Sequence, residues 1–187
     1  AARATAGRHS IARAYGDAAR MLADQQPDIV WVCTPNAFHR PYVELALQAG
    51  CHVLCEKPIA TTYHDAEVLY ATAQDVGRTL MVSQTARWEV RALAARRLAQ
   101  GGALGQIYYA EASAMRRRGT PQWGQFHIKA ASGGGPVLDL GVHILDSLLW
   151  IMGSPRVTSV SAVTFAKLAA QEESLVTSLA ASGAPLG

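Results

Sequence analysis

The sequence predicts an α/β chain, in which a parallel sheet is followed by a region with an antiparallel sheet. Two patterns lead to this prediction. In the first half, short apolar runs rich in β-branched residues alternate with helix-forming segments, which is typical of βαβ units. In the second half, alternation between apolar and polar residues indicates strands with one solvent-exposed face. Half of the 187 residues are hydrophobic and 17% are charged, which excludes a disordered chain.

The first strand is expected after two helical segments. Ala1–Ser10 has the composition of a helix end, and Asp17 can cap a short helix that runs to Leu22. Ile29–Cys33 is apolar and rich in β-branched residues, so we expect a strand that is buried on both faces. Pro35 cannot continue a ladder of hydrogen bonds and therefore ends this strand.

A helix and a second strand follow. Pro41 is tolerated in the first turn of a helix that runs to about Gln48, and Gly50 is placed to end it. His52–Cys55 has the composition of a strand, and Glu56–Pro58 ends it.

The third strand completes the expected parallel sheet. Thr61 or Thr62 can cap a helix that runs to about Val76, where Gly77 ends it. Thr79–Ser83 then has strand composition. Three strands separated by two helices at this spacing predict two βαβ units.

After residue 85 the pattern changes. The expected elements are a helix at 89–100, a strand at 107–115, a long loop at 117–135, a helix at 137–152, a strand at 157–165 and an unpatterned tail from 169. The alternation at 107–115 suits an antiparallel sheet.

Charge and hydropathy restrict the partners. The net charge is +3 and the only tight basic run is Arg116–Arg118, so binding of nucleic acid is not expected. That run fits either a sugar-binding loop or a solvated strand end. Val137–Met152 is the most apolar stretch, but Asp139, His143 and Asp146 interrupt it, so no membrane span is expected.

The three cysteines, Cys33, Cys51 and Cys55, cannot all pair with one another. Their apolar surroundings favour reduced, partly buried thiols in a cytoplasmic protein. A zinc site built from Cys51, His52 and Cys55 is the disfavoured alternative, because alternation along a strand sends these side chains to different faces.

Polar side chains gather where two strands of the expected parallel sheet end. Thr34–Asn36 with His39 follows the first strand, and Glu56–Pro58 follows the second. Ligands bind outside the carboxyl ends of such strands. The chain has three lysines against fourteen arginines, and Lys57 is placed to reach a ligand oxygen. The alternative is a surface lysine paired with Glu56.

A second polar cluster precedes and opens the helix at 137–152. Gly133–Gly135 permits a close approach of the backbone to a ligand. Asp139 and His143 are four residues apart and share one helix face, with Asp146 three residues further on. A carboxylate beside a histidine can tune it for proton transfer. The alternative is a capping aspartate and a histidine that faces the core.

These two clusters carry a resemblance to a known family. The matching residues are Cys33–Asn36 with His39, Ala49–Pro58, Gly133–His143, Asp146, Trp150 and Gly153. They resemble the Gfo/Idh/MocA oxidoreductases over about residues 1–168. Two ordered motifs make this far more specific than a lone glycine motif.

The resemblance implies three regions: a partial Rossmann dinucleotide-binding domain at 1–85, a partial α/β substrate domain with an open antiparallel sheet at 86–168, and a tail at 169–187. It implies NAD or NADP as cofactor and a sugar, polyol or related compound as substrate. Family members place a glycine-rich turn before the first residue seen here, so the chain resembles a fragment, about half of a full member. A homo-oligomer is possible in this family.

Site residues follow from the resemblance by position. His143 would act as general acid and base, Asp139 would assist it, and Lys57 would lie near nicotinamide and substrate. The residues expected to line the cofactor are Thr34, Pro35, Asn36, His39, Glu56, Lys57, Pro58 and Thr85. No metal is implied.

Three other functions share these residues. A non-catalytic dinucleotide- or sugar-binding regulator would use the same scaffold, although it needs no acid–base pair. A glycosidase that oxidises its substrate transiently with NAD would cleave glycosides without net NADH. A metal site built around Asp139 and His143 is the third alternative.

Overall fold

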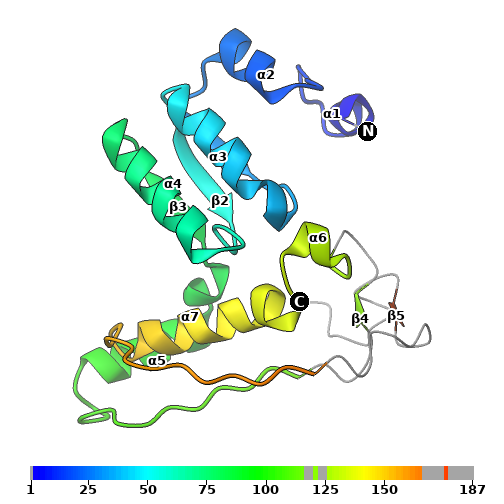
Figure 1. The fold of residues 1–187 in the computed structure, drawn as a ribbon. Helices are drawn as coiled ribbons and strands as arrows, with labels where there is room; N and C mark the ends of the chain where they lie inside the picture. Colours follow the sequence, from blue (N-terminus) through cyan, green and yellow to red (C-terminus); the bar gives the residue numbers. More distant parts are fainter. Residues whose placement is uncertain (1, 116–119, 122–125, 166–174, 177–187) are drawn as a thin grey trace. The chain divides into compact units, whose positions relative to one another are not determined.

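The computed structural model describes residues 2–115, 120–121, 126–165 and 175–176. It contains two compact units (Figure 1). The first unit is Ala1–Thr34 with Phe38–Ser83, and the second is Pro35–Ala37 with Gln84–Gly187. Each unit is described by itself below.

A parallel sheet is the centre of the first unit, as predicted. Its strands are β1 (Ile29–Val32), β2 (His52–Glu56) and β3 (Leu80–Ser83), in the order β1-β2-β3. Both neighbouring pairs are parallel, and Cys55 of β2 lies opposite Val32 of β1 and Val82 of β3. The three strands therefore end level with one another, at the edge where polar residues follow.

Four helices accompany these strands. They are α1 (Ala2–Arg8), α2 (Ala18–Gln25), α3 (His39–Gln48) and α4 (Tyr63–Asp75). The two predicted caps are confirmed, because the side chain of Asp17 accepts from the backbone N–H of Arg20 and that of Thr62 from Asp65. Helix α3 begins at His39, two residues before the predicted start, which places that histidine inside the first turn.

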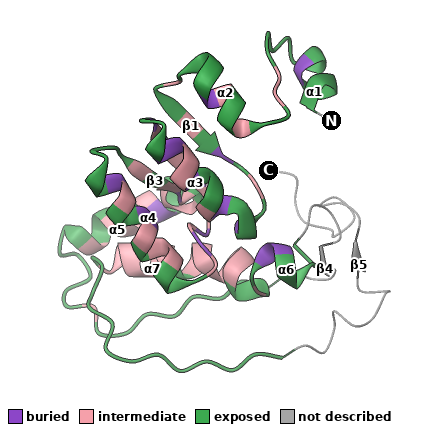
Figure 2. Ribbon diagram, turned by 45° about the horizontal axis from the view of Figure 1, so that its top comes forward, coloured by how far each residue is buried: buried purple, intermediate pink, exposed green. Residues whose placement is uncertain are grey.

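The core of the first unit lies between the sheet and two helices. Helix α3 contacts β1 and β2, and α4 contacts β3. Val43 and Leu47 of α3 and Leu69 of α4 are fully buried, and they form one hydrophobic cluster with Val53 and Cys55 of β2. Figure 2 shows buried positions on both helices. Burial of such side chains supplies the main stabilising term of the unit.

The prediction that β1 is buried on both faces is wrong within the described residues. Val32 is buried, but Ile29 and Trp31 are 67% and 60% exposed. Successive strand residues point to opposite faces, and α3 covers only the face that carries Val32. An apolar run shows that a strand has hydrophobic residues on both faces, not that both are covered.

Helices dominate the described part of the second unit. They are η2 (Thr85–Trp88), α5 (Val90–Gln100), α6 (Lys129–Ser132), the π-helical turn η3 (Val137–Gly141) and α7 (Val142–Ile151). Helix α5 contacts α7, and η3 continues directly into α7. The predicted helices at 89–100 and 137–152 are therefore present, the second with a wider first turn.

The predicted strands at 107–115 and 157–165 are wrong. Both segments lie outside helices and strands, and their residues are almost all exposed. A strand is defined by its ladder to a neighbour, and neither segment has such a partner among the described residues. Among the described residues of the second unit, the only strand pair is β4 (Thr120–Pro121) with β5 (Leu175–Val176). This pair is parallel rather than antiparallel.

The predicted loop at 117–135 contains the short helix α6, where the structure describes it. Its residues Lys129–Ser132 include two alanines, which favour a helical turn, and Gly133 ends it with φ +75°. Arg116–Arg118 lie outside the described residues, as does most of the tail from 169.

By length and composition alone, the stretch Lys129–Ile151, which contains α6, η3 and α7, could cross a membrane. One such helix is weak support for a membrane span, because core helices of soluble proteins pass the same test. Three polar side chains, Asp139, His143 and Asp146, lie within it.

The cysteines differ in accessibility. All three are free thiols; Cys51 and Cys55 are buried, whereas Cys33 is exposed, contrary to the expectation of partial burial for all. Among the described residues there is no cluster of three or more side chains that could hold a metal ion.

We therefore expect selective alkylation of the native chain. Burial raises the pKa of the Cys55 thiol to about 12, with smaller contributions from Glu56 and Cys33, and burial also raises the pKa of Cys51. Partial burial raises the pKa of Cys33 as well, followed by the charge of Glu56, but only Cys33 is exposed. The thiolate has to reach the reagent, so at about pH 8 iodoacetamide should label Cys33 first. Mass spectrometry should find Cys51 and Cys55 labelled only in denaturant. A Cys33→Ser chain that is still labelled rapidly in the native state would contradict this.

Candidate functional site

The first part of the site is the carboxyl edge of the parallel sheet. Thr34 follows β1, and Glu56, the last residue of β2, leads into Lys57 and Pro58. Glu56 and Lys57 are partly buried and Pro58 is buried. Because β1 and β2 are parallel neighbours, these two loops lie on the same edge.

His39, the first residue of α3, contacts both loops through its side chain. Its side chain is fully buried. The ring nitrogen Nδ1 lies 2.7 Å from the carbonyl oxygen of Pro58, and Nε2 lies 2.8 Å from that of Thr34. Both ring nitrogens are thus occupied by backbone oxygens. A direct contact between His39 and a cofactor stays a prediction. In this structure the ring connects the backbone of the two loops.

Two buried polar atoms at strand ends have no hydrogen-bond partner among the described residues. They are Oγ1 of Thr34, after β1, and Oε1 of Gln84, directly after β3. Buried polar atoms are nearly always satisfied, so an atom without a partner in the protein indicates a place for a ligand or water. Sequence reasoning selected Thr34 but missed Gln84, although its position after a strand was the same signal.

Asn36 belongs to the second unit and holds its glycine-rich turn. The side-chain amide Nδ2 of this buried residue donates to the carbonyl oxygen of Ser132, at 2.8 Å. The hydroxyl of Ser132 donates in turn to the carbonyl oxygen of Gly134, at 2.7 Å. A Cβ at Gly134 would come within 2.8 Å of the end of the Leu138 side chain, so a larger residue there would have to displace that side chain.

Asp139 and His143 lie on either side of a change in helix type. Asp139 is in the π-helical turn η3, and His143 is in the first turn of α7. Atom Nδ1 of His143 is shielded from solvent. Single π-helical turns are frequent at functional sites. The assistance of His143 by Asp139 stays a prediction.

Two arginines, Arg87 and Arg96, contact the middle and the end of α7. Arg87 of η2 makes a bidentate ion pair with Asp146, with nitrogen–oxygen distances of 2.7 Å and 2.5 Å. Its guanidinium also lies 5.8 Å from the ring centre of Trp150. Arg96 of α5 stacks on the same ring at 4.3 Å and donates to the Trp150 carbonyl oxygen. Planar guanidinium groups suit both contacts.

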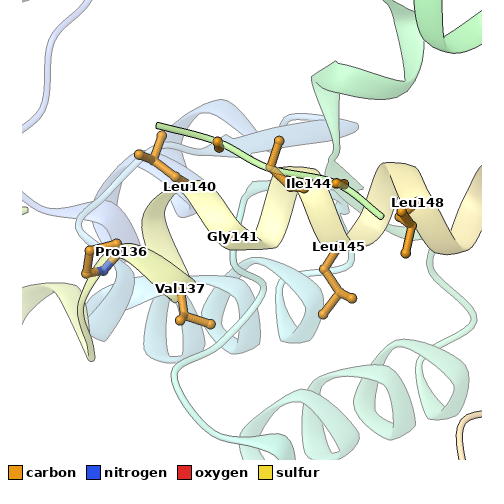
Figure 3. A pocket seen from close by; sticks show the side chains of 9 residues that line it. Pro136, Val137, Leu140, Gly141, Ile144, Leu145 and Leu148 are labelled. Carbon is orange, nitrogen blue, oxygen red and sulfur yellow. The ribbon is translucent and has the colours of Figure 1, made fainter. Parts of the chain in front are cut away.

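An apolar groove runs along the side of η3 and α7 (Figure 3). Its volume is about 370 Å³, and Ala112 and Ala114 of the extended segment 107–115 form its other wall. The remaining lining residues are Pro136, Val137, Leu140, Gly141, Ile144, Leu145 and Leu148. Because these side chains carry no polar atoms, the groove suits hydrophobic packing rather than acid–base chemistry.

The predicted site residues are therefore divided between the two units. Lys57 and His39 belong to the first unit, and Asp139 and His143 to the second. Thr85 opens η2 in the second unit and is exposed. Convergence of Lys57 and His143 on one substrate stays a prediction.

Family comparisons agree with this geometry. Residues 1–84 match the oxidoreductase family described as having an NAD-binding Rossmann fold, and residues 92–183 match the C-terminal domain of the same family. The chain belongs to the Gfo/Idh/MocA oxidoreductase family. Its first unit accordingly has a Rossmann-type parallel sheet with helices.

Among curated Gfo/Idh/MocA-type relatives, the D-glucoside 3-dehydrogenase of Escherichia coli K12 is 40% identical over 171 residues, which cover 91% of this chain and 49% of the relative. The D-apiose dehydrogenase of Paraburkholderia graminis is 36% identical over 87% of this chain and 42% of the relative. The chain thus spans about half the length of the curated relatives that it matches.

Solved structures give the same result. The aldose–aldose oxidoreductase of Caulobacter crescentus, solved with glycerol, has a TM-score of 0.66 and 30% identity over 81% of this chain and 46% of its own. A levoglucosan dehydrogenase solved with NADH and levoglucosan has a TM-score of 0.66 and 26% identity, covering 81% of this Gfo/Idh/MocA chain and 42% of its own.

A double-mutant cycle tests the Arg87–Asp146 pair. Arg87→Gln, Asp146→Asn and the double variant should give a coupling energy of about 1 kcal/mol or more in urea unfolding, because two partly buried charges share two hydrogen bonds. The exposed pair Arg20–Asp24, 3.6 Å apart, is the matched control and should give about 0.3–0.5 kcal/mol. Equal coupling in the two cycles would show that Arg87 does not anchor α7.

Proposed function

We propose that the chain forms part of an NAD(P)-dependent oxidoreductase, which transfers a hydride between nicotinamide and a CH–OH group of a sugar, polyol or related carbonyl compound. The observation that carries this proposal is the buried Thr34 hydroxyl, which has no partner among the described residues. It lies beyond the carboxyl end of a strand in a chain that matches an NAD-binding Rossmann fold, where ligands of such sheets bind. The named activities of the D-glucoside, D-apiose and levoglucosan dehydrogenases support the substrate class.

The residues at the sheet edge suit a dinucleotide. Thr34 offers a hydroxyl that can donate or accept, and Gln84 offers an amide oxygen whose natural partner is a donor such as a ribose hydroxyl. Lys57 supplies a compact cation for a ligand oxygen. The bound nicotinamide would supply the hydride acceptor or donor.

His143 would move the proton. As the hydride leaves the substrate carbon, the hydroxyl proton has to leave its oxygen, and a positioned imidazole can accept it. We assign this step to Nε2, because Nδ1 is shielded from solvent. Lys57 would stabilise the negative charge that develops on the substrate oxygen. In the reverse direction the same imidazole would return the proton to the carbonyl oxygen.

The free thiols favour a reducing compartment, so we also propose a cytoplasmic location.

The first test is a calorimetric titration of the 187-residue chain with NAD and with NADP. We expect binding of at least one dinucleotide by the parent chain and by His143→Asn, because His143 is assigned to the proton and not to the cofactor. The second readout is the rate at which the chain oxidises a sugar or polyol, measured as NADH or NADPH formation. This rate should fall by about 10²–10⁴-fold in His143→Asn, which is the usual contribution of a general base.

His127→Asn is the matched control, because His127 is an exposed histidine of the same unit. It should retain the parent rate. Dinucleotide binding without any turnover would favour the non-catalytic regulator, and glycoside cleavage without net NADH would favour the glycosidase. Failure of the parent chain to bind either dinucleotide would refute the proposal for this chain.

A further inference from the structure

The contacts of His39 differ from those of an ordinary core histidine. The ring is fully buried at the start of α3, and each nitrogen meets a backbone carbonyl oxygen. One oxygen belongs to Thr34, two residues beyond the end of β1, and the other to Pro58, in the loop after β2. The same side chain therefore touches both loops of the carboxyl edge.

Backbone carbonyl groups at a strand end need new partners, because the ladder of the sheet no longer supplies them. The carbonyl groups of Thr34 and Pro58 lie beyond the last paired residues Val32, Cys55 and Glu56. A buried donor is worth most at such a position, since an unsatisfied buried carbonyl group costs about 1–3 kcal/mol. His39 meets two of these groups with one planar ring.

We propose that His39 is a positioning residue, which holds the Thr34 loop and the Lys57–Pro58 loop at the separation that the dinucleotide requires. This inference rests on the proposed function. It gives His39 an indirect role: the ring contacts the backbone of the cofactor-binding loops, and those loops present Thr34 and Lys57 to the ligand. We refer to the two contacts together as the His39 bridge.

The bridge matters because both ligand groups are attached to the backbone segments it joins. Lys57 precedes Pro58 directly, and Thr34 supplies both the bridged carbonyl oxygen and the buried Oγ1 that has no partner in the described structure. Small displacements of binding groups have large effects on a site, with losses of about 10²-fold for about 1 Å. Two contacts of 2.7 Å and 2.8 Å from one rigid ring restrict such displacements.

Two conservative variants separate the halves of the bridge. In His39→Asn, the amide nitrogen takes roughly the place of Nδ1 and can still donate to Pro58, but it cannot reach Thr34. In His39→Gln, the amide nitrogen takes roughly the place of Nε2 and can still donate to Thr34. His39→Leu removes both contacts. His9→Asn, at an exposed histidine of the same unit, is the control.

Hydrogen–deuterium exchange of the whole chain should give a crossed pattern. His39→Asn should raise exchange at 33–38 more than at 56–61, and His39→Gln should do the reverse. His39→Leu should raise both, if it folds, and His9→Asn neither. In calorimetry, the dissociation constant for the dinucleotide should rise by about tenfold in His39→Leu, as is common when the support of a ligand-binding shell is removed.

A uniform rise in exchange with no difference between the Asn and Gln variants would overturn the inference, because it would show a histidine that only fills the core. An unchanged dissociation constant despite the crossed pattern would overturn the positioning role. A parent chain that binds no dinucleotide would refute the proposed function and the positioning role with it. In that case the crossed pattern would still establish the bridge.

Discussion

Parallel pairing of β1, β2 and β3 is the constraint on which the candidate site depends. In this arrangement every strand runs in the same direction, so the residues that follow the three strands come to one edge although they are far apart in sequence. The helices α3 and α4 return the chain to the opposite edge each time. The polar residues Thr34 and Lys57 of the first unit lie at one edge for this reason.

The same constraint leaves backbone groups without partners where the ladder stops. At the ends of β1 and β2, His39 meets two of these carbonyl groups from the first turn of α3. A helix that began at Pro41, as the sequence predicted, would leave His39 in a loop. The earlier start places the imidazole within reach of the carbonyl groups of Thr34 and Pro58, which follow β1 and β2.

The sequence was a reliable guide where local signals and burial agree. The caps Asp17 and Thr62 have side chains that suit an exposed helix start, and the three strands of the parallel sheet have apolar, β-branched cores. It failed where an element needs a distant partner. The alternation at 107–115 and 157–165 is a strand pattern, but a ladder also needs a neighbour, and no strand pairs with these segments in the described residues.

For the site, position after a strand was sufficient to select Thr34 and Lys57. The contacts between Asn36 and Ser132 and between Arg87 and Asp146 join residues too far apart in sequence for any local pattern to reveal.

These long-range contacts have a consequence for His143. Asn36 holds the carbonyl group of Ser132, just before the glycine-rich turn that leads through η3 into α7. Arg87 and Arg96 hold α7 itself, through Asp146 in its middle and Trp150 near its end. A proton-transferring side chain works best when its backbone is rigid and its supporting contacts are specific. The π-helical turn at Val137–Gly141 adds width to the helix where Asp139 lies, and Gly134 lets the preceding turn approach Leu138 closely. Within the second unit, the helical stretch that carries His143 is thus held by contacts of Asn36, Arg87 and Arg96. Under the proposed function, substitution of Arg87 would therefore act on proton transfer through the position of α7.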